Sequence, residues 1–148
     1  GGGRRSPYGA LGGPELYVEI VHPIRGAEVV CGGPGCKIEL EYRVRGTKAE
    51  KLGAGGVKSK ILINGHVALA DGGALHVRTS VVDLPVSHHV LEVHAWEEGG
   101  SAQAGDGHSF RVVHLRVEKP KKTSSGDMTQ TISFGGAKRI ELGWGVEE

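Results

Sequence analysis

Histidine is the residue type in this 148-residue chain with the most capacity for metal or proton chemistry, with eight copies beside two cysteines. His94 and His114 are the best pair, because they fall on predicted strands that are neighbours along the chain. With Trp96 opposite His108 in that hairpin, the two imidazoles are about 13 Å apart, at roughly 3.3 Å per residue. A shared ion needs ligand bonds of about 2 Å. We therefore predict dispersed surface histidines and no metal site.

Short motifs that would indicate catalysis are missing or misplaced. The run 105–109 holds an aspartate, a histidine and a serine, but neighbours in sequence cannot converge as a catalytic triad does, so we predict a loop there. The glycine-rich run 32–37 has the wrong spacing for a phosphate loop, and a predicted strand follows it. Acidic residues at predicted loop tips show no known calcium-ligand spacing; they are Asp71, Asp83, Glu97, Glu98 and Asp106. We predict no enzyme and no cofactor.

Trp96 is the best candidate for a ligand contact, because it lies on the outward parity of a predicted strand beside His94. Together with Glu97 and the predicted loop over residues 97–107, it would bind a glycan or a protein. The competing interpretation is structural: Trp96 covers a sheet edge or contacts the C-terminal hairpin. Both interpretations stay open at the level of sequence.

The most basic segment offers no nucleic-acid site. Its lysines are Lys48, Lys51, Lys58 and Lys60. No aromatic residues interleave with them to stack on bases, and the formal net charge of the chain is only +1. We therefore predict a solvated face, no nucleic-acid partner and no attraction to an anionic membrane.

Cys31 and Cys36 bracket Gly-Gly-Pro-Gly, a turn-forming run that would bring two thiols to bonding distance. A small structural disulfide is the interpretation we favour, and two free thiols or a reactive pair are the alternatives. A zinc site lacks the second cysteine pair, and the thioredoxin-type spacing is Cys-x-x-Cys. A disulfide would favour a secreted or lumenal setting.

Two-residue alternation of apolar and polar side chains runs through the middle of the chain. The clearest case is 37–45, where Ile38, Leu40, Tyr42 and Val44 share one face. Asn64-Gly65 indicates a tight hairpin. Further strands are predicted over 16–22, 27–30, 58–63, 67–69, 74–84, 88–96 and 108–117. No helix is predicted, and the glycine- and lysine-bearing segment 46–56 is expected to be a loop.

The last of these strands contains a conflict of parity. Phe110 and Val112 share one face, whereas Leu115 and Val117 share the other. A β-bulge near Val112 and Val113 would place all four residues on the core side. We therefore predict a bulge at that point.

Residues 16–117 resemble immunoglobulin-like and fibronectin-III-like modules. The resemblance lies in the 38–44 alternation, in Ile61-x-Ile63-Asn64-Gly65 and in Leu84 followed by the alternation of 89–95. The inter-sheet cysteine pair and the third-strand tryptophan of antibody domains are missing. The resemblance implies an all-β, immunoglobulin-like antiparallel sandwich of about seven strands. It also places His89 where such domains often carry a corner tyrosine, so its ring is expected to be buried and bonded to backbone of the preceding turn.

The resemblance implies a non-catalytic module of a larger secreted or lumenal protein, of the kind found beside carbohydrate-active domains. Such a module spaces, docks or stabilises its neighbour, so its partner is a neighbouring domain or protein, with a glycan as the alternative. A histidine-based metal site is a third and weaker alternative.

The ends of the chain differ in composition from its middle. We predict a flexible leader over residues 1–14, the sandwich over 15–118 and a linker over 119–128. Residues 129–148 are predicted to form an extra hairpin or the start of a following domain. The hairpin strands are 129–134 and 139–144, around Gly135-Gly136. Because the chain begins with Gly1 and shows no apolar signal segment, we expect a processed or excised piece. No apolar run is long enough for a membrane-spanning helix.

Overall fold

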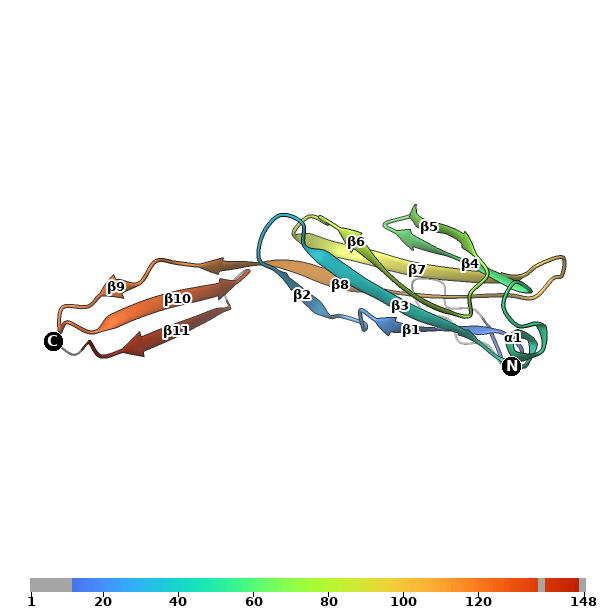
Figure 1. Ribbon diagram of the computed structural model, residues 1–148, viewed down its shortest axis with the longest axis horizontal. Coiled ribbons are helices and arrows are strands. Elements are labelled where there is room, and N and C mark those ends of the chain that lie inside the picture. Colours follow the sequence, from blue (N-terminus) through green and yellow to red (C-terminus); the bar gives the residue numbers. More distant parts are fainter. Residues whose placement is uncertain (1–11, 136–137, 147–148) are drawn as a thin grey trace.

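Strands make up nearly all of the regular structure, as the two-residue alternation predicts (Figure 1). The computed structural model describes residues 12–135 and 138–146, so the predicted leader up to residue 11 and the side chain of Asp71 lie outside the described part. The elements are β1 (Tyr17–His22), β2 (Glu28–Cys31), β3 (Lys37–Arg45), α1 (Thr47–Leu52), β4 (Val57–Ile63), β5 (His66–Gly72), β6 (His76–Val82), β7 (Ser87–Glu97), β8 (Gln103–Val117), β9 (Lys121–Lys122), β10 (Met128–Phe134) and β11 (Arg139–Trp144).

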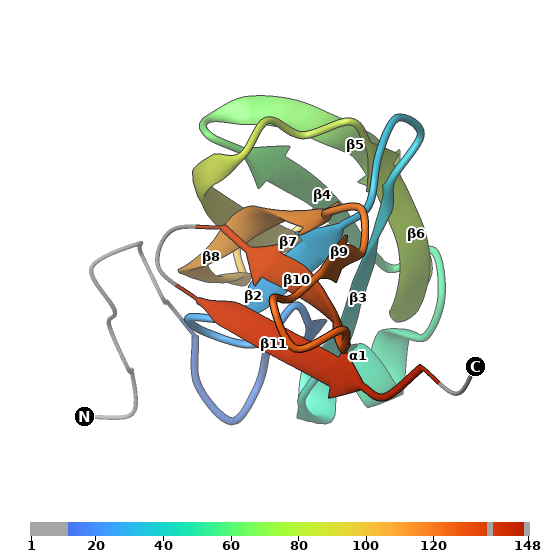
Figure 2. The same cartoon turned by 90° about the vertical axis from the view of Figure 1, so that its left-hand side faces the viewer.

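The strands form two sheets that share one core. β1, β3 and β6 make a three-stranded antiparallel sheet. The second sheet runs in the order β5-β4-β7-β8-β10-β11, while β2 pairs with β8 in parallel and β9 pairs with β10. Side chains of both sheets meet in the interior, which the strands surround in Figure 2. The predicted all-β class with antiparallel sheets is confirmed, and the described residues form eleven strands.

β3 shows how the sequence alternation produces the core. Its even-numbered residues, Ile38 to Val44, are between 1% and 4% exposed, and the residues between them face outward. Tyr42 also carries a hydroxyl into the interior, where it hydrogen-bonds to the Ser59 hydroxyl of β4 in the other sheet. Burial raises the pKa of the Tyr42 phenol, so the hydroxyl stays protonated. The two sheets are therefore joined by one satisfied polar contact within an apolar core.

The two turn-related predictions with the sharpest geometry are confirmed. Cys31 and Cys36 form a disulfide that links the end of β2 to the start of β3. His89 is 3% exposed, and its Nε2–H donates to the Pro85 carbonyl in the preceding turn at 2.7 Å. Its Nδ1 lies 2.9 Å from Asn64 Nδ2, an amide N–H donor. One imidazole therefore fastens β7 to the Asn64-Gly65 hairpin and to the corner before the strand.

The predicted loop after β3 contains a short helix, α1, which is a correction. Gly46 has φ +118°, and a Cβ there would lie 2.4 Å from the Glu15 carbonyl oxygen. This close approach lets the Thr47 and Lys48 N–H groups donate to carbonyls of Pro14 and Glu15. Ala49 is then buried at 1% exposure. These partners come from a distant part of the sequence, so local glycine content indicated a loop where tertiary contacts form a helical turn.

The predicted register between β7 and β8 is also wrong. Trp96 pairs with Gln103 rather than with His108, because β8 begins at Gln103 and the connecting loop is short. Nor does β8 contain the predicted bulge: its pairing with β2 runs without a shift from Arg111 to His114. Val112 is in the core, whereas Val113 faces the other side and is covered near Gly135. The parity conflict marks the point where β8 passes from one packing surface to another.

Beyond that point, β8 continues outward and carries the C-terminal strands with it (Figure 1). Phe134 to Ile132 of β10 pair with Leu115 to Val117 of β8, and β10 pairs with β11 from Met128 to Ser133. The predicted strands over 129–134 and 139–144 are therefore present. We call β8 residues 115–117 with β10 and β11 the C-terminal ribbon.

Candidate functional site

No catalytic or metal cluster forms in the part of the chain that the structure describes. Within it, no group of three or more His, Cys, Asp or Glu side chains is arranged to hold a metal ion. His94 lies opposite Gly105 in β8, and His114 belongs to the stretch paired with β2, so the two do not meet. Two of the histidines are structural, since His108 Nε2–H donates to the Pro23 carbonyl at 2.6 Å and His89 closes its corner.

The run 105–109 lies inside β8 and is not a loop, contrary to expectation. Asp106 Oδ1 accepts a hydrogen bond from the Gly107 N–H. His108 is only 5% exposed, so its ring lies in the interior. Consecutive strand residues project to opposite faces. The aspartate, histidine and serine therefore make no triad, although their residue types are those of one.

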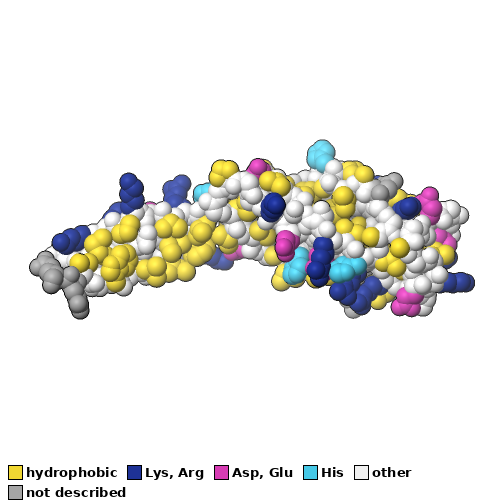
Figure 3. Space-filling model, in the orientation of Figure 1, with side chains coloured by type: hydrophobic (Ala, Val, Ile, Leu, Met, Phe, Trp, Pro, Cys, Tyr) yellow, Lys and Arg dark blue, Asp and Glu magenta, His cyan; other side chains and the backbone are white. Residues whose placement is uncertain are grey.

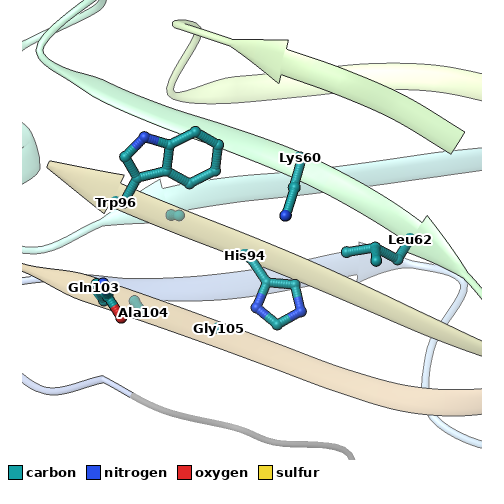
Figure 4. A pocket seen from close by; sticks show the side chains of 8 residues that line it. Lys60, Leu62, His94, Trp96, Gln103, Ala104 and Gly105 are labelled. Carbon is teal, nitrogen blue, oxygen red and sulfur yellow. The ribbon is translucent and has the colours of Figure 1, made fainter. Parts of the chain in front are cut away.

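A hollow of about 330 Å³ lies on the outer face of the second sheet, at the end of β7 (Figure 4). Trp96 and His94 border it from β7, Lys60 and Leu62 from β4, and Gln103 from β8. Gly105 lies directly opposite His94 and brings no side chain. The remaining lining residues are Ala95 and Ala104. The structure thus brings Trp96 and His94 together on one surface, as the outward parity of β7 predicts.

The polar groups of this hollow are a lysine, an imidazole and an amide, set beside the apolar side chains of Trp96 and Leu62. Lys60 Nζ lies 6.0 Å from the centroid of the Trp96 ring, within cation–π range. Among the described residues, Lys60 makes no ion pair. His94 Nε2 is 3.2 Å from Glu92 Oε2, and its side chain is 40% exposed. The Gln103 amide is exposed at the rim.

Glu97 does not line the hollow. Its Oε2 lies 3.1 Å from Lys48 Nζ and accepts from the Ala102 N–H at 3.3 Å. The hydrogen bond from Lys48 holds the pKa of the Glu97 carboxyl below its usual value. Glu97 therefore ties the β7–β8 loop to α1. Because its carboxylate is bound by Lys48 and by the Ala102 N–H, it does not face a ligand at Trp96.

Lys60, Leu62 and Gln103 are the site residues that sequence reasoning missed. The sequence predicts a solvated basic face for Lys60, whereas the pairing of β4 with β7 places it beside His94. The structural interpretation in which Trp96 contacts the C-terminal hairpin is not supported, because Trp96 lies at the opposite end of β7 from the strand end where β8 leaves for the ribbon. The clue in sequence was the shared outward parity of Lys60 and Trp96, which becomes useful only with the strand order known.

The C-terminal ribbon presents a second candidate surface, an apolar sheet face. The pairing places Val117, Ile132 and Ile140 in one row and Leu115 beside Phe134 in the next. Ile140, Leu142 and Trp144 are 46%, 44% and 42% exposed. Figure 3 shows hydrophobic side chains gathered along this end of the molecule. Among the described residues, no element packs across this face.

The outer edge of β11 is also unpaired among the described residues. The Phe134 N–H donates to the Lys138 carbonyl, and the Glu118 N–H donates to the Thr131 carbonyl. Antiparallel hydrogen bonds alternate along a strand, so the even-numbered residues of β11 face β10. The backbone N–H and C=O groups of Arg139, Glu141 and Gly143 therefore point away from the ribbon, ready to pair with another strand.

A third polar cluster lies on the outer face of the first sheet. Glu41 of β3 accepts from His76 Nε2 at 2.6 Å and lies 3.3 Å from Arg78 Nε, with His22 Nε2 at 3.9 Å. The hydrogen bond from His76, followed by that from Arg78, holds the pKa of Glu41 below its usual value. The carboxylate is already satisfied by neighbouring strands, so this cluster fastens the sheet.

The described helical residues include no segment of the length and apolarity needed to cross a bilayer. Comparison with known proteins gives no match: no protein-family model, no curated protein and no solved structure is similar to the chain.

Proposed function

We propose that the chain is a non-catalytic, immunoglobulin-like β-sandwich module of a larger secreted or lumenal protein, which docks a neighbouring domain or partner polypeptide. The observation that carries the proposal is the C-terminal ribbon, with an exposed apolar face and an unpaired edge side by side. Apolar patches of this kind on a protein surface mark interaction sites. A strand edge adjoining such a face can bind a polypeptide through its backbone as well as its side chains.

The strand order supports the immunoglobulin-like assignment. The three-stranded sheet β1-β3-β6 faces the series β8-β7-β4-β5, so the chain crosses between the sheets from β3 to β4, from β5 to β6 and from β6 to β7, as in Greek-key sandwiches. The hydrogen bond from His89 to the Pro85 carbonyl matches the role of a corner tyrosine. The ribbon and β2 add strands beyond the usual seven.

The disulfide supports the secreted or lumenal setting. Cys31 is 7% exposed, and its bond to Cys36 closes the connection between β2 and β3. Structural disulfides of this kind persist in oxidising compartments and are rare in the cytosol.

Backbone amide exchange of β11 in the intact parent protein tests the docking proposal. We expect the Arg139, Glu141 and Gly143 amides to be protected in the parent and to exchange freely in the 148-residue chain, because docking pairs the outer edge. Leu142→Lys in the parent should remove that protection, since it places a charge on the apolar face.

The matched control is Val67→Lys on β5, the strand at the other edge of the same sheet, where Val67 is 58% exposed. This change should leave the β11 amides protected. Free exchange of all three β11 amides in the unmodified parent would contradict docking through the ribbon.

A saccharide-binding module is the second candidate, favoured by the hollow at Trp96. A half-buried indole beside exposed polar groups offers a flat apolar surface with donors at its margin (Figure 4). Glycan-array binding that is lost in Trp96→Ala would support it. Binding that is unchanged in Trp96→Ala removes Trp96 from the site.

A further inference from the structure

The hollow at the end of β7 has the chemistry of a site for an acidic sugar, and we propose that it binds a saccharide bearing a carboxylate. This inference rests on the second candidate function above and specifies its ligand class. Trp96 provides the stacking surface for the sugar ring, and the Lys60 ammonium receives the carboxylate.

The balance of donors and acceptors favours an anionic ligand. The residues that line the hollow include Lys60, His94 and Gln103 but no Asp or Glu. A neutral sugar presents hydroxyl groups that need acceptors as well as donors, and carboxylate side chains are the strongest acceptors a protein can offer. Here the nearby carboxylate, Glu92, is already engaged by His94 at 3.2 Å. The site therefore suits a ligand that itself carries the acceptor charge.

Lys60 is the decisive residue. Its ammonium has the Trp96 ring at 6.0 Å and no carboxylate partner among the described residues. Lys48, near this end of the sheet, differs in this respect, since it is paired with Glu97 at 3.1 Å. An ammonium 6.0 Å from the centroid of an aromatic ring can bond a carboxylate on a sugar that stacks on the same ring. The same sugar residue can therefore stack on the Trp96 indole and bond the Lys60 ammonium through its carboxylate.

The volume of the hollow and the strands that line it fit a short saccharide. Its volume of about 330 Å³ lies at the lower end of ligand pockets, so it suits a small number of sugar rings. Lys60 and His94 are directly paired across β4 and β7, and Gln103 is paired with Trp96 across β7 and β8. The recognising groups thus stand on three strands of one sheet, a rigid support that needs no rearrangement to present them.

The test uses trigalacturonic acid and its methyl ester, which share the sugar rings and differ in charge. Titration of the full chain is followed by the NMR signal of the Trp96 indole N–H. We expect the acid to bind and the ester to bind more weakly by about tenfold, the effect of losing one hydrogen bond to a charged group. Lys60→Met should weaken acid binding by about the same factor and leave ester binding unchanged.

Two further variants make the result specific. Trp96→Leu should abolish binding of both ligands, because it removes the stacking surface. Lys37→Met, which removes the same charge from an exposed position at the start of β3, should change neither affinity. Unchanged thermal melting of each variant separates loss of binding from loss of fold.

The outcomes distinguish this inference from the candidate function beneath it. Equal binding of acid and ester overturns the carboxylate inference and leaves a saccharide site. No binding of either ligand at concentrations up to about 10 mM, weaker than any useful affinity, overturns both. Preferential binding of uridine monophosphate over the acid would also overturn the inference, since it assigns the indole to base stacking. The docking proposal for the C-terminal ribbon is unaffected by each of these results.

Discussion

Individual polar residues in this protein are used to fasten strands. Tyr42 and Ser59 join the two sheets across the core, and His89 joins β7 to the turn before it and to Asn64. His108 joins β8 to the Pro23 carbonyl that follows β1. Each of these buried side chains has a partner, which is the condition under which a polar group can be kept in an apolar interior. A buried histidine here is therefore explained by its hydrogen bonds and needs no catalytic role.

The Tyr42–Ser59 contact leads to a stability prediction. Tyr42→Phe leaves the Ser59 hydroxyl, 1% exposed, without its partner. The free energy of unfolding should fall by about 1–3 kcal/mol, the cost of an unsatisfied buried polar group. Urea unfolding should show a lower midpoint with an unchanged slope.

The double variant Tyr42→Phe with Ser59→Ala should recover part of that loss, because neither hydroxyl is then stranded. Tyr17→Phe is the control, since Tyr17 is 40% exposed and should tolerate the change. A Tyr42→Phe protein as stable as the parent would show that the contact between the sheets contributes nothing.

At the scale of elements, the first sheet is joined on its outer face by one carboxylate. Glu41 of β3 binds His76 and Arg78 of β6 and lies near His22 of β1, so it touches all three strands. The other charged groups on this face of β3 include Glu39 and Arg43. Because His76 and Arg78 hold the pKa of Glu41 below the ordinary value of 4.5, folding stabilises the ionised form.

The resulting pH dependence has a definite sign. The ionised Glu41 contributes stability above its unfolded pKa, and this contribution is lost as the pH falls through the lower folded pKa. Glu41→Gln should therefore melt at a lower temperature than the parent at pH 7. The difference should vanish on acidification below the folded pKa of Glu41. Thermal melts of both proteins from about pH 3 to pH 7 check this.

The control is Glu50→Gln in α1, whose carboxyl lies away from this network and is exposed. It should melt like the parent over the same range of pH. A constant difference between Glu41→Gln and the parent at every pH would contradict the electrostatic role of Glu41.

Elements with strong local signals could be predicted from the sequence, and those created by distant contacts could not. The alternation of β3, the Asn64-Gly65 turn and the Cys31–Cys36 closure are encoded within a few residues of one another. Helix α1 depends on carbonyls of Pro14 and Glu15, so glycine content alone indicated a loop. The parity change at Val113 indicates a bulge only because the sequence does not show that a second surface covers this residue.

The candidate site likewise combines residues that a local sequence pattern places and residues that only long-range strand pairing places. The outward position of Trp96 and His94 follows from the alternation within β7. Lys60 joins them only because β4 pairs with β7, and Gln103 only because the loop before β8 is shorter than predicted. Strand order and register are properties of long-range pairing, so those two contributors had no local signal.

At the scale of the whole molecule, the sandwich and the C-terminal ribbon differ in how they are held. The apolar residues of β4 alternate into the core, and Ile61 is fully buried. Every residue of β11 is exposed. Regions with little buried apolar surface open more readily than the core. The ribbon should therefore be the least stable part of the regular structure when nothing is docked on it.

Hydrogen exchange of the 148-residue chain checks this expectation. The amides of β10 and β11 that pair with each other should exchange before those shared by β4 and β7, because opening the ribbon exposes little new apolar surface. Ile132→Thr, on the apolar face of β10, should accelerate exchange in the ribbon and leave β4 unchanged. Exchange of both regions at one common rate would show instead that sandwich and ribbon unfold as a unit.

Because β8 belongs to both parts, it also determines how tension would pass through the molecule. β1 starts near one end of the sandwich and β8 leaves the sandwich at the other, with the strands between them nearly along the long axis (Figure 1). Pulling on the ribbon would load the β7–β8 hydrogen bonds in shear, all ten paired positions from Ser87 to Trp96 together, rather than unzipping them one at a time. Such a strand arrangement resists force along its length better than one whose hydrogen bonds open in sequence.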